Sequence, residues 1–124
     1  VEPYPRDFLS AGVPGITRLE IRKVQELPPC WFDQLDAGDI LFIDSSHVCK
    51  TGSDVNHLYL KVLPRLRPGV IVHIHDIFLP CEYLKSWVLE ENRSWNEQYL
   101  VQVVLQHSTR YRVRHRDGHY VHVW

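Results

Sequence analysis

The sequence DILFID at residues 39–44 is an unbroken apolar run that ends in a carboxylate, Asp44. The sequence VIVHIHD at residues 70–76 repeats this pattern and ends in Asp76. Continuous apolar character over so few residues is typical of a parallel strand that helices cover on both faces. We therefore predict two buried parallel strands, over residues 39–44 and 70–76.

A helix signal separates the two apolar runs. Apolar residues recur at three- and four-residue spacing over Val55–Leu66, which predicts one apolar stripe on a helix. Ser53 or Asp54 can cap the start of this helix, and Pro68-Gly69 ends it. Strand, helix and strand at this spacing form a βαβ unit with a right-handed crossover.

The flanking segments add weaker elements. We predict a strand over residues 19–24 and helices over residues 82–91 and 96–106. Near the end of the chain, two alternating runs flank Asp117-Gly118, which predicts an antiparallel hairpin. The chain is therefore expected to be an α/β domain with a mostly parallel sheet, helices on both faces and a C-terminal hairpin.

Bulk composition limits the class of protein. With 124 residues the chain has room for a single domain, and its formal net charge of −1 argues against nucleic-acid or acidic-membrane partners. No apolar run approaches the roughly 20 residues of a membrane span, and no signal peptide is visible. Three widely spaced cysteines predict reduced thiols in a cytoplasmic protein. The chain starts at Val1 and lacks methionine, so we expect it to be a truncated domain.

The two acids at the strand ends are the candidate chemical groups. Ligands of open α/β sheets bind outside the carboxyl ends of the strands, where Asp44 and Asp76 are expected to lie together. The two carboxylates can share a divalent cation with His75 or His47, or each can instead cap a helix or bind loop amides. His47, in the loop after the first run, is also placed to act as a base near neutral pH.

These residues resemble a known family. The stretches Phe42-Ile43-Asp44-Ser45-Ser46-His47, Pro68-Gly69 and His73-Ile74-His75-Asp76 are similar to one branch of the class I S-adenosylmethionine-dependent methyltransferases. That branch has an F-I-D-x-x-H strand end, a downstream Asp that opens a helix (here Asp54), a P-G step and a strand that closes in H-D. Trp95–Leu100 is also similar to it. The resemblance covers about residues 1–105.

The resemblance implies a Rossmann-like sheet of order 3-2-1-4-5-7-6, in which the two apolar runs are strands four and five. It implies that Glu2 holds the cofactor ribose and that Gln25 contacts adenine. Asp44, His75 and Asp76 match positions that hold magnesium or another divalent metal in relatives, with a histidine where relatives often carry an acid. Strand one and its glycine-rich loop are missing, so we expect this fragment to bind S-adenosylmethionine poorly and to be inactive by itself.

The function implied is methyl transfer to a small-molecule hydroxyl or amine, with His47 accepting the released proton. Two alternatives stay open: a metal-dependent hydroxylase-like enzyme on the same scaffold, and a noncatalytic Rossmann-like module used for assembly. The outer edge of the first strand is expected to be exposed and to favour a homodimer. The sequence does not identify the methyl acceptor.

Overall fold

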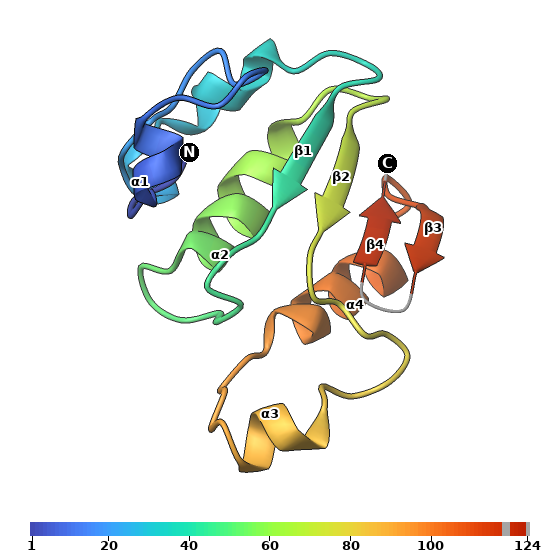
Figure 1. Cartoon of the computed structure of the whole chain (residues 1–124). Helices are drawn as coiled ribbons and strands as arrows, with labels where there is room; N and C mark the ends of the chain where they lie inside the picture. Colours follow the sequence, from blue (N-terminus) through green and yellow to red (C-terminus); the bar gives the residue numbers. More distant parts are fainter. Residues whose placement is uncertain (118–119, 124) are drawn as a thin grey trace.

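The computed structural model of the chain describes residues 1–117 and 120–123. Four strands, β1 (Ile40–Ile43), β2 (Ile71–Ile74), β3 (Val113–Asp117) and β4 (Tyr120–Val123), form one sheet of order β1-β2-β4-β3. β1 and β2 are parallel, whereas β4 pairs antiparallel with both β2 and β3 (Figure 1). The predicted mixture of a parallel pair and a C-terminal antiparallel hairpin is confirmed. The predicted turn of that hairpin includes Gly118, which lies outside the described residues.

The central βαβ unit matches its prediction closely. Ile43 of β1 is paired in register with Ile74 of β2, and His75 extends this ladder by donating its backbone N–H to the Ile43 carbonyl (2.9 Å). This register brings the residues that follow each strand to the same edge of the sheet. Asp44 and Asp76 therefore leave the sheet side by side.

The crossover begins as α2 (Asp54–His57), continues as a π-helical turn (Leu58–Val62) and ends as a 3₁₀ turn (Leu63–Arg65). Ser53 caps it by accepting a hydrogen bond from the backbone N–H of Asn56 (3.1 Å). The regular helix stops near Pro64 because proline has no N–H to donate and its ring crowds the preceding turn.

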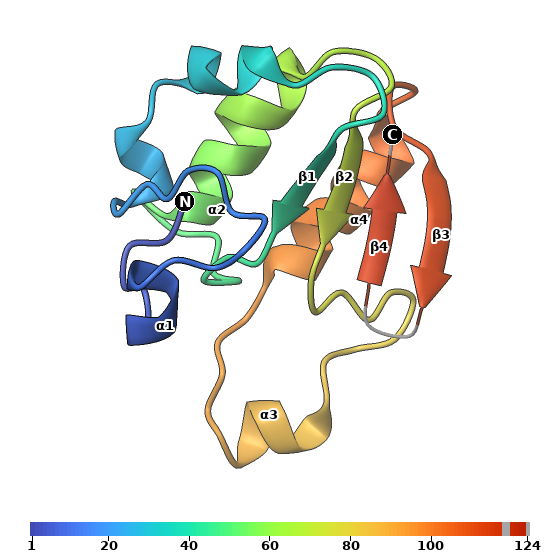
Figure 2. The same ribbon diagram turned by 45° about the horizontal axis from the view of Figure 1, so that its top comes forward.

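One face of the parallel pair packs against helices. In Figures 1 and 2, α2 and α4 (Glu97–His107) both lie behind the sheet. The buried core joins alternate strand residues to one stripe of each helix. Its central members are Ile43, Val72, Ile74, Val55, Val62 and Val101.

The opposite face contradicts the prediction of helices on both faces. Ile40 is 62% exposed and Phe42 is 57% exposed, and Phe42 stacks on His73 of β2 with 4.7 Å between the ring centroids. Alternate side chains of a strand point to opposite faces, so Leu41 and Ile43 enter the core while their neighbours point away from it. Among the described residues no helix covers that second face. The segment before β1 lies beside the sheet and not over it (Figure 2).

The predicted strand over residues 19–24 is also wrong. The N-terminal region instead contains α1 (Asp7–Ser10) and two 3₁₀ helices, Val24–Glu26 and Pro29–Gln34. An extended segment becomes a strand only by pairing along its length, and here one backbone hydrogen bond joins Glu2 to Glu20 (3.0 Å). Strands two and three of the implied seven-stranded order are therefore not formed in the described residues.

The connection from β2 to α4 leaves the body of the domain. It contains α3 (Lys85–Leu89), which is shorter than the predicted helix and projects below the sheet in both views (Figures 1 and 2). α4 follows the predicted helix within one residue at each end. None of the helices in the described part of the chain has the length and apolar character needed to cross a bilayer.

Candidate active site

Two carboxylates from the ends of the parallel strands converge on one imidazole. The Nε2 atom of His47 lies 3.5 Å from Oδ1 of Asp44 and 3.9 Å from Oδ2 of Asp76. His47 and Asp76 both adopt left-handed backbone conformations, with φ of 56° and 54°. A positive φ is uncommon outside glycine and asparagine and marks tight local turns, here the ones that bring these side chains together. The predicted common rim is confirmed.

A buried glutamate holds the other side of the ring. Nδ1 of His47 lies 2.8 Å from Oε2 of Glu97, whose side chain is 0% exposed. Ser45 donates its hydroxyl to the same oxygen (2.7 Å). The first residues of α4 also bind this loop, because the N–H groups of Asn96 and Glu97 donate to the His47 carbonyl (2.9 and 3.2 Å). Two segments 50 residues apart in the chain are thus joined by side-chain and backbone bonds.

The electrostatics of this cluster favour a charged imidazole. Burial by itself lowers the pKa of His47, but the hydrogen bond and charge of Glu97, with the charges of Asp76 and Asp44, outweigh it and raise the pKa. Burial, together with the nearby Glu97 carboxylate, raises the pKa of the Tyr59 hydroxyl well above its usual value.

Glu97 was not predicted as a site residue. The only signal for it is the similarity of Trp95–Leu100 to the family.

An aromatic side chain covers the imidazole. The Trp95 ring lies over His47 with 4.1 Å between the ring centroids, so that the His47 side chain is 4% exposed. The Asp44 side chain is 58% exposed, and that of Asp76 is 18% exposed. A bound molecule can therefore contact the two carboxylates directly. It can interact with His47, the predicted base, only by way of these carboxylates.

The arrangement does not fit the predicted metal site. Among the side chains that the structure describes, those of residues 1–113, no group of three or more His, Cys, Asp or Glu is arranged to hold a metal ion. Asp44 and Asp76 both face His47, and Nδ1 of His75 lies 3.0 Å from Oδ1 of Asp76. Nε2 of His47 thus lies within 4 Å of a carboxylate oxygen of each acid.

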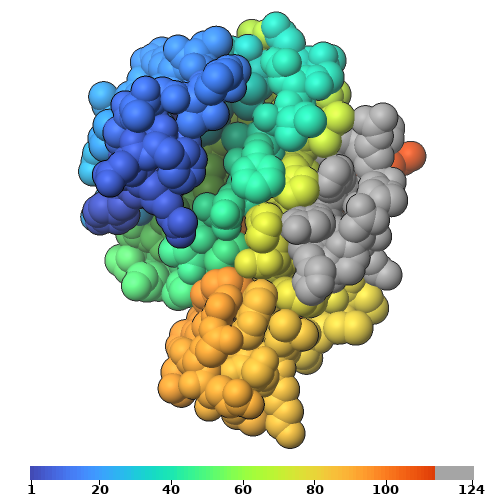
Figure 3. All heavy atoms as spheres, viewed as in Figure 1, coloured from blue at the N-terminus to red at the C-terminus, as the bar shows by residue number. Residues whose placement is uncertain are grey.

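A cavity of about 700 Å³ opens on the N-terminal side of the rim. Glu2, Gln25 and Asp44, which the sequence assigns to the cofactor and the rim, all line it. Figure 3 shows the hollow between the N-terminal segment and the strand that ends at Asp44. Gln25 donates its side-chain amide to the Gly52 carbonyl (3.1 Å), and Glu2 accepts the backbone N–H of Tyr4 (2.9 Å). The structure thus brings the proposed cofactor residues to the edge of the candidate site.

Comparison with protein families adds independent evidence. A family model described as a methyltransferase domain matches residues 2–77. The match includes Glu2, Gln25, His47 and the two strand-end acids. Neither the curated proteins nor the solved structures contain a match to the chain. Because the family match spans more than half of the sequence and includes the whole βαβ unit, the chain belongs to the class I S-adenosylmethionine-dependent methyltransferase family.

Proposed function

We propose that this domain serves S-adenosylmethionine-dependent methyl transfer to a hydroxyl or amine of a small molecule. The observation that carries the proposal is the convergence of Asp44 and Asp76 on His47, together with the position of Asp44 in the lining of the cavity that Glu2 and Gln25 also line. Methyl transfer is the chemistry of the family that the chain matches. The cofactor, when bound, supplies an electrophilic methyl group.

The N-terminal cavity suits such a cofactor. Its volume of about 700 Å³ lies within the range of about 300–1,000 Å³ that is common for small-molecule sites. The Glu2 carboxylate is a hydrogen-bond acceptor for ribose hydroxyls, and Gln25 offers both a donor and an acceptor to adenine. We assign these two side chains to cofactor binding, as the family resemblance implies.

The strand-end acids are assigned to the acceptor. Asp44 is exposed enough to accept a hydrogen bond from an acceptor hydroxyl and to orient its oxygen. With the cofactor bound as methyl donor, Asp44 would accept the proton that the acceptor hydroxyl loses on methylation. His47 then acts through Asp44 and Asp76, and buried Glu97 fixes the direction of the ring. We therefore assign direct proton acceptance, which the sequence suggested for His47, to Asp44, and we assign His47 a positioning role behind the carboxylates.

The test uses the full gene product and a labelled cofactor. Replacing Asp44 by Asn should lower kcat about 100-fold or more, because positioned proton acceptors contribute about 10²–10⁴-fold. Asp76→Asn should also lower kcat. Asp7→Asn, on the exposed first turn of α1, is the matched control and should leave turnover unchanged. Normal turnover in the Asp44→Asn and Asp76→Asn enzymes would remove both acids from the mechanism.

A second role is favoured by the uncovered sheet face. β1 is an edge strand, and two of its own residues, Ile40 and Phe42, have mostly exposed apolar side chains. Edge strands with exposed apolar residues pair readily with other chains. We propose that two copies associate through this edge, so that the domain also serves assembly. Light scattering tests this proposal, and a monomer at high protein concentration would contradict it.

A further inference from the structure

The first turn of α4 contacts both of the loops that leave the parallel strands. Glu97 holds the loop after β1, because its carboxylate binds His47 and Ser45. The next two residues of the helix, Gln98 and Tyr99, bind the loop after β2 instead. The loops that follow the two rim acids are therefore both bound to one turn of one helix.

Gln98 is 0% exposed and uses both ends of its side-chain amide. Its Oε1 atom accepts the backbone N–H of Phe78 (3.3 Å), and its Nε2 atom donates to the Cys81 carbonyl (3.4 Å). A backbone N–H and a carbonyl need opposite ends of an amide, so one orientation of the side chain satisfies both. Because Phe78 comes two residues after Asp76, the first of these bonds fixes the backbone just beyond the acid.

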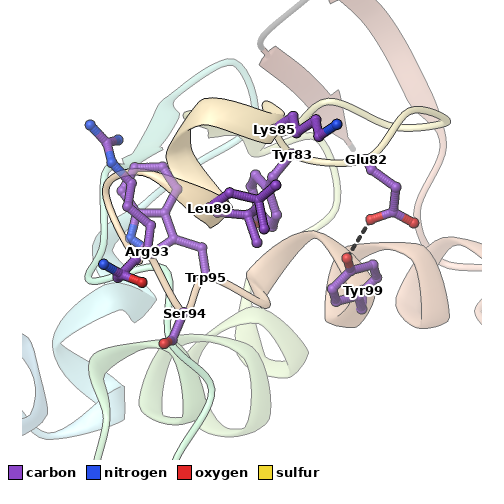
Figure 4. Close-up of a pocket in the computed structure, with 10 residues that line it drawn as sticks. Glu82, Tyr83, Lys85, Leu89, Arg93, Ser94, Trp95 and Tyr99 are labelled. Atoms are coloured by element: carbon purple, nitrogen blue, oxygen red, sulfur yellow. Dashed lines mark hydrogen bonds between the residues drawn. The ribbon is translucent and has the colours of Figure 1, made fainter.

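Two further hydrogen bonds join the same loop to α4. The Tyr83 hydroxyl accepts the backbone N–H of Gln98 (3.1 Å). The Tyr99 hydroxyl donates to the Glu82 carboxylate across the gap between the loop and the helix, as Figure 4 shows. The loop after β2 is thus bound to α4 along residues 78–83.

The backbone of Asp76 lies between this loop and the sheet. Its φ of 54° is left-handed, and such a conformation persists only where the flanking structure fixes it. On the sheet side, the N–H of His75 donates to the Ile43 carbonyl (2.9 Å) and so continues the ladder of β2. On the loop side, the bond from Phe78 to the Gln98 amide provides the second attachment.

We propose that Gln98 is a positioning residue that sets the distance between Asp76 and the imidazole of His47. In the structure, Oδ2 of Asp76 lies 3.9 Å from Nε2 of His47. Loss of the amide removes the attachment on the loop side of Asp76, so the carboxylate is expected to move away from the ring. The importance of this distance rests on the proposed function, but the distance itself can be measured without turnover.

The first experiment is a crystal structure of the full chain with Gln98→Met, in which an apolar side chain of similar length replaces the amide. We expect the distance from Asp76 to His47 to increase from 3.9 Å by about 1 Å, a misplacement that can cost about 100-fold in rate. The distance of 3.5 Å from Asp44 to His47 should not change, because Glu97 still holds that loop. Gln102→Met, at an exposed position one turn further along α4, is the matched control and should leave both distances unchanged.

A second experiment separates positioning from a general loss of structure. In the labelled-cofactor assay of the full gene product, Gln98→Met should lower kcat about 10- to 100-fold. The affinity for S-adenosylhomocysteine, measured by calorimetric titration, should stay within about two-fold, because the lining of the cofactor cavity lies within residues 1–58. An equal loss of turnover and of this affinity would overturn the positioning role.

An unmoved Asp76 in the Gln98→Met structure would also overturn the proposal, as would the same movement in the Gln102→Met structure. Should the Gln98→Met protein fail to fold, amide hydrogen exchange in the unaltered protein decides the point. Slow exchange of the Phe78 N–H supports its attachment to Gln98, and rapid exchange in an otherwise protected domain overturns it.

Failure of the proposed function gives a different set of results. If Asp76 moves in the Gln98→Met structure but kcat is unchanged, the positioning role of Gln98 stands and the part of Asp76 in methyl transfer fails. If Asp76→Asn lowers kcat while Gln98→Met changes neither the distance nor kcat, the positioning role fails and the proposed function stands.

Discussion

Replacing Glu97 by Gln tests the buried centre of the site. The Glu97 side chain is 0% exposed, and its Oε2 atom binds both Nδ1 of His47 (2.8 Å) and the hydroxyl of Ser45 (2.7 Å). Glutamine has nearly the same shape and keeps one oxygen for these bonds. The substitution therefore removes the charge of Glu97 with little change in packing.

The size of the effect follows from the burial of the pair. Removing one partner of a buried ion pair costs about 3–5 kcal/mol. Because glutamine keeps a hydrogen bond, we expect the lower end, about 3 kcal/mol. For a chain of this length that loss corresponds to a fall in Tm of about 10 °C.

The loss should depend on pH, with a sign set by His47. Burial lowers the pKa of His47, but the hydrogen bond and charge of Glu97 outweigh this effect, so the pKa is raised in the folded protein. The charged imidazole therefore contributes its full stabilisation at pH values below the unfolded pKa of about 6.5. That stabilisation disappears as the pH rises through the raised folded pKa. The Glu97→Gln effect should be largest near pH 5.5 and small near pH 9, where a buried carboxylate beside a neutral ring contributes little.

Urea unfolding followed by tryptophan fluorescence measures both free energies. The control is Glu26→Gln, an exposed acid in a 3₁₀ turn, for which we expect a change within about 0.5 kcal/mol at either pH. A Glu97→Gln protein that is destabilised by the same amount near pH 5.5 and near pH 9 would refute the charge coupling between Glu97 and His47. An unchanged stability at both values would refute the role of the pair altogether.

Three further predictions concern the scaffold. Ser53→Ala removes the cap of α2 and should lower the free energy of unfolding by about 1 kcal/mol in the same urea assay, whereas Ser53→Thr should keep most of it. Burial raises the pKa of Tyr83 to about 12, so a spectrophotometric titration should lose its highest-pH ionisation step when Tyr83 is replaced by Phe, and stability should fall as the pH rises above about 10. Phe42→Asp should leave the stability of the monomer within about 0.5 kcal/mol, because the side chain is mostly exposed, and should abolish the proposed dimer in light scattering. An unchanged dimer would move the interface away from this face.

The sequence predicts the βαβ unit well because its signals are local. An apolar run, a helical stripe with a Ser53 cap and a Pro68-Gly69 step each follow from neighbours in the chain. Parallel topology then carries the ends of the two strands to one edge, so the meeting of Asp44 and Asp76 can be predicted although they are far apart in sequence.

The sequence predicts the buried centre poorly because no local signal marks it. An acid in the first turn of a helix usually interacts with the exposed N-terminal amides of that helix, and Glu97 has this sequence context. Its burial depends on how α4 packs against the loop that holds His47, a contact between residues 50 positions apart. The error over residues 19–24 has a related cause, because a run suited to a strand forms one only where another strand is available to pair with it.

The chain itself offers a second source of positive charge at the rim besides the predicted metal. Two carboxylates close together need a positive charge between them, since like charges at short range repel. The predicted solution is a divalent metal with His75 or His47. In the structure Nε2 of His47 lies within 4 Å of an oxygen of Asp44 and of Asp76, and Glu97 contacts its other ring nitrogen. A positive charge supplied by the chain depends on pH, whereas one supplied by a bound metal depends on metal concentration. If this reasoning holds, a chelator leaves the stability of the domain unchanged, and His47→Asn destabilises it more near pH 5.5 than near pH 9. A fall in Tm on adding the chelator would show that the two acids hold a metal after all.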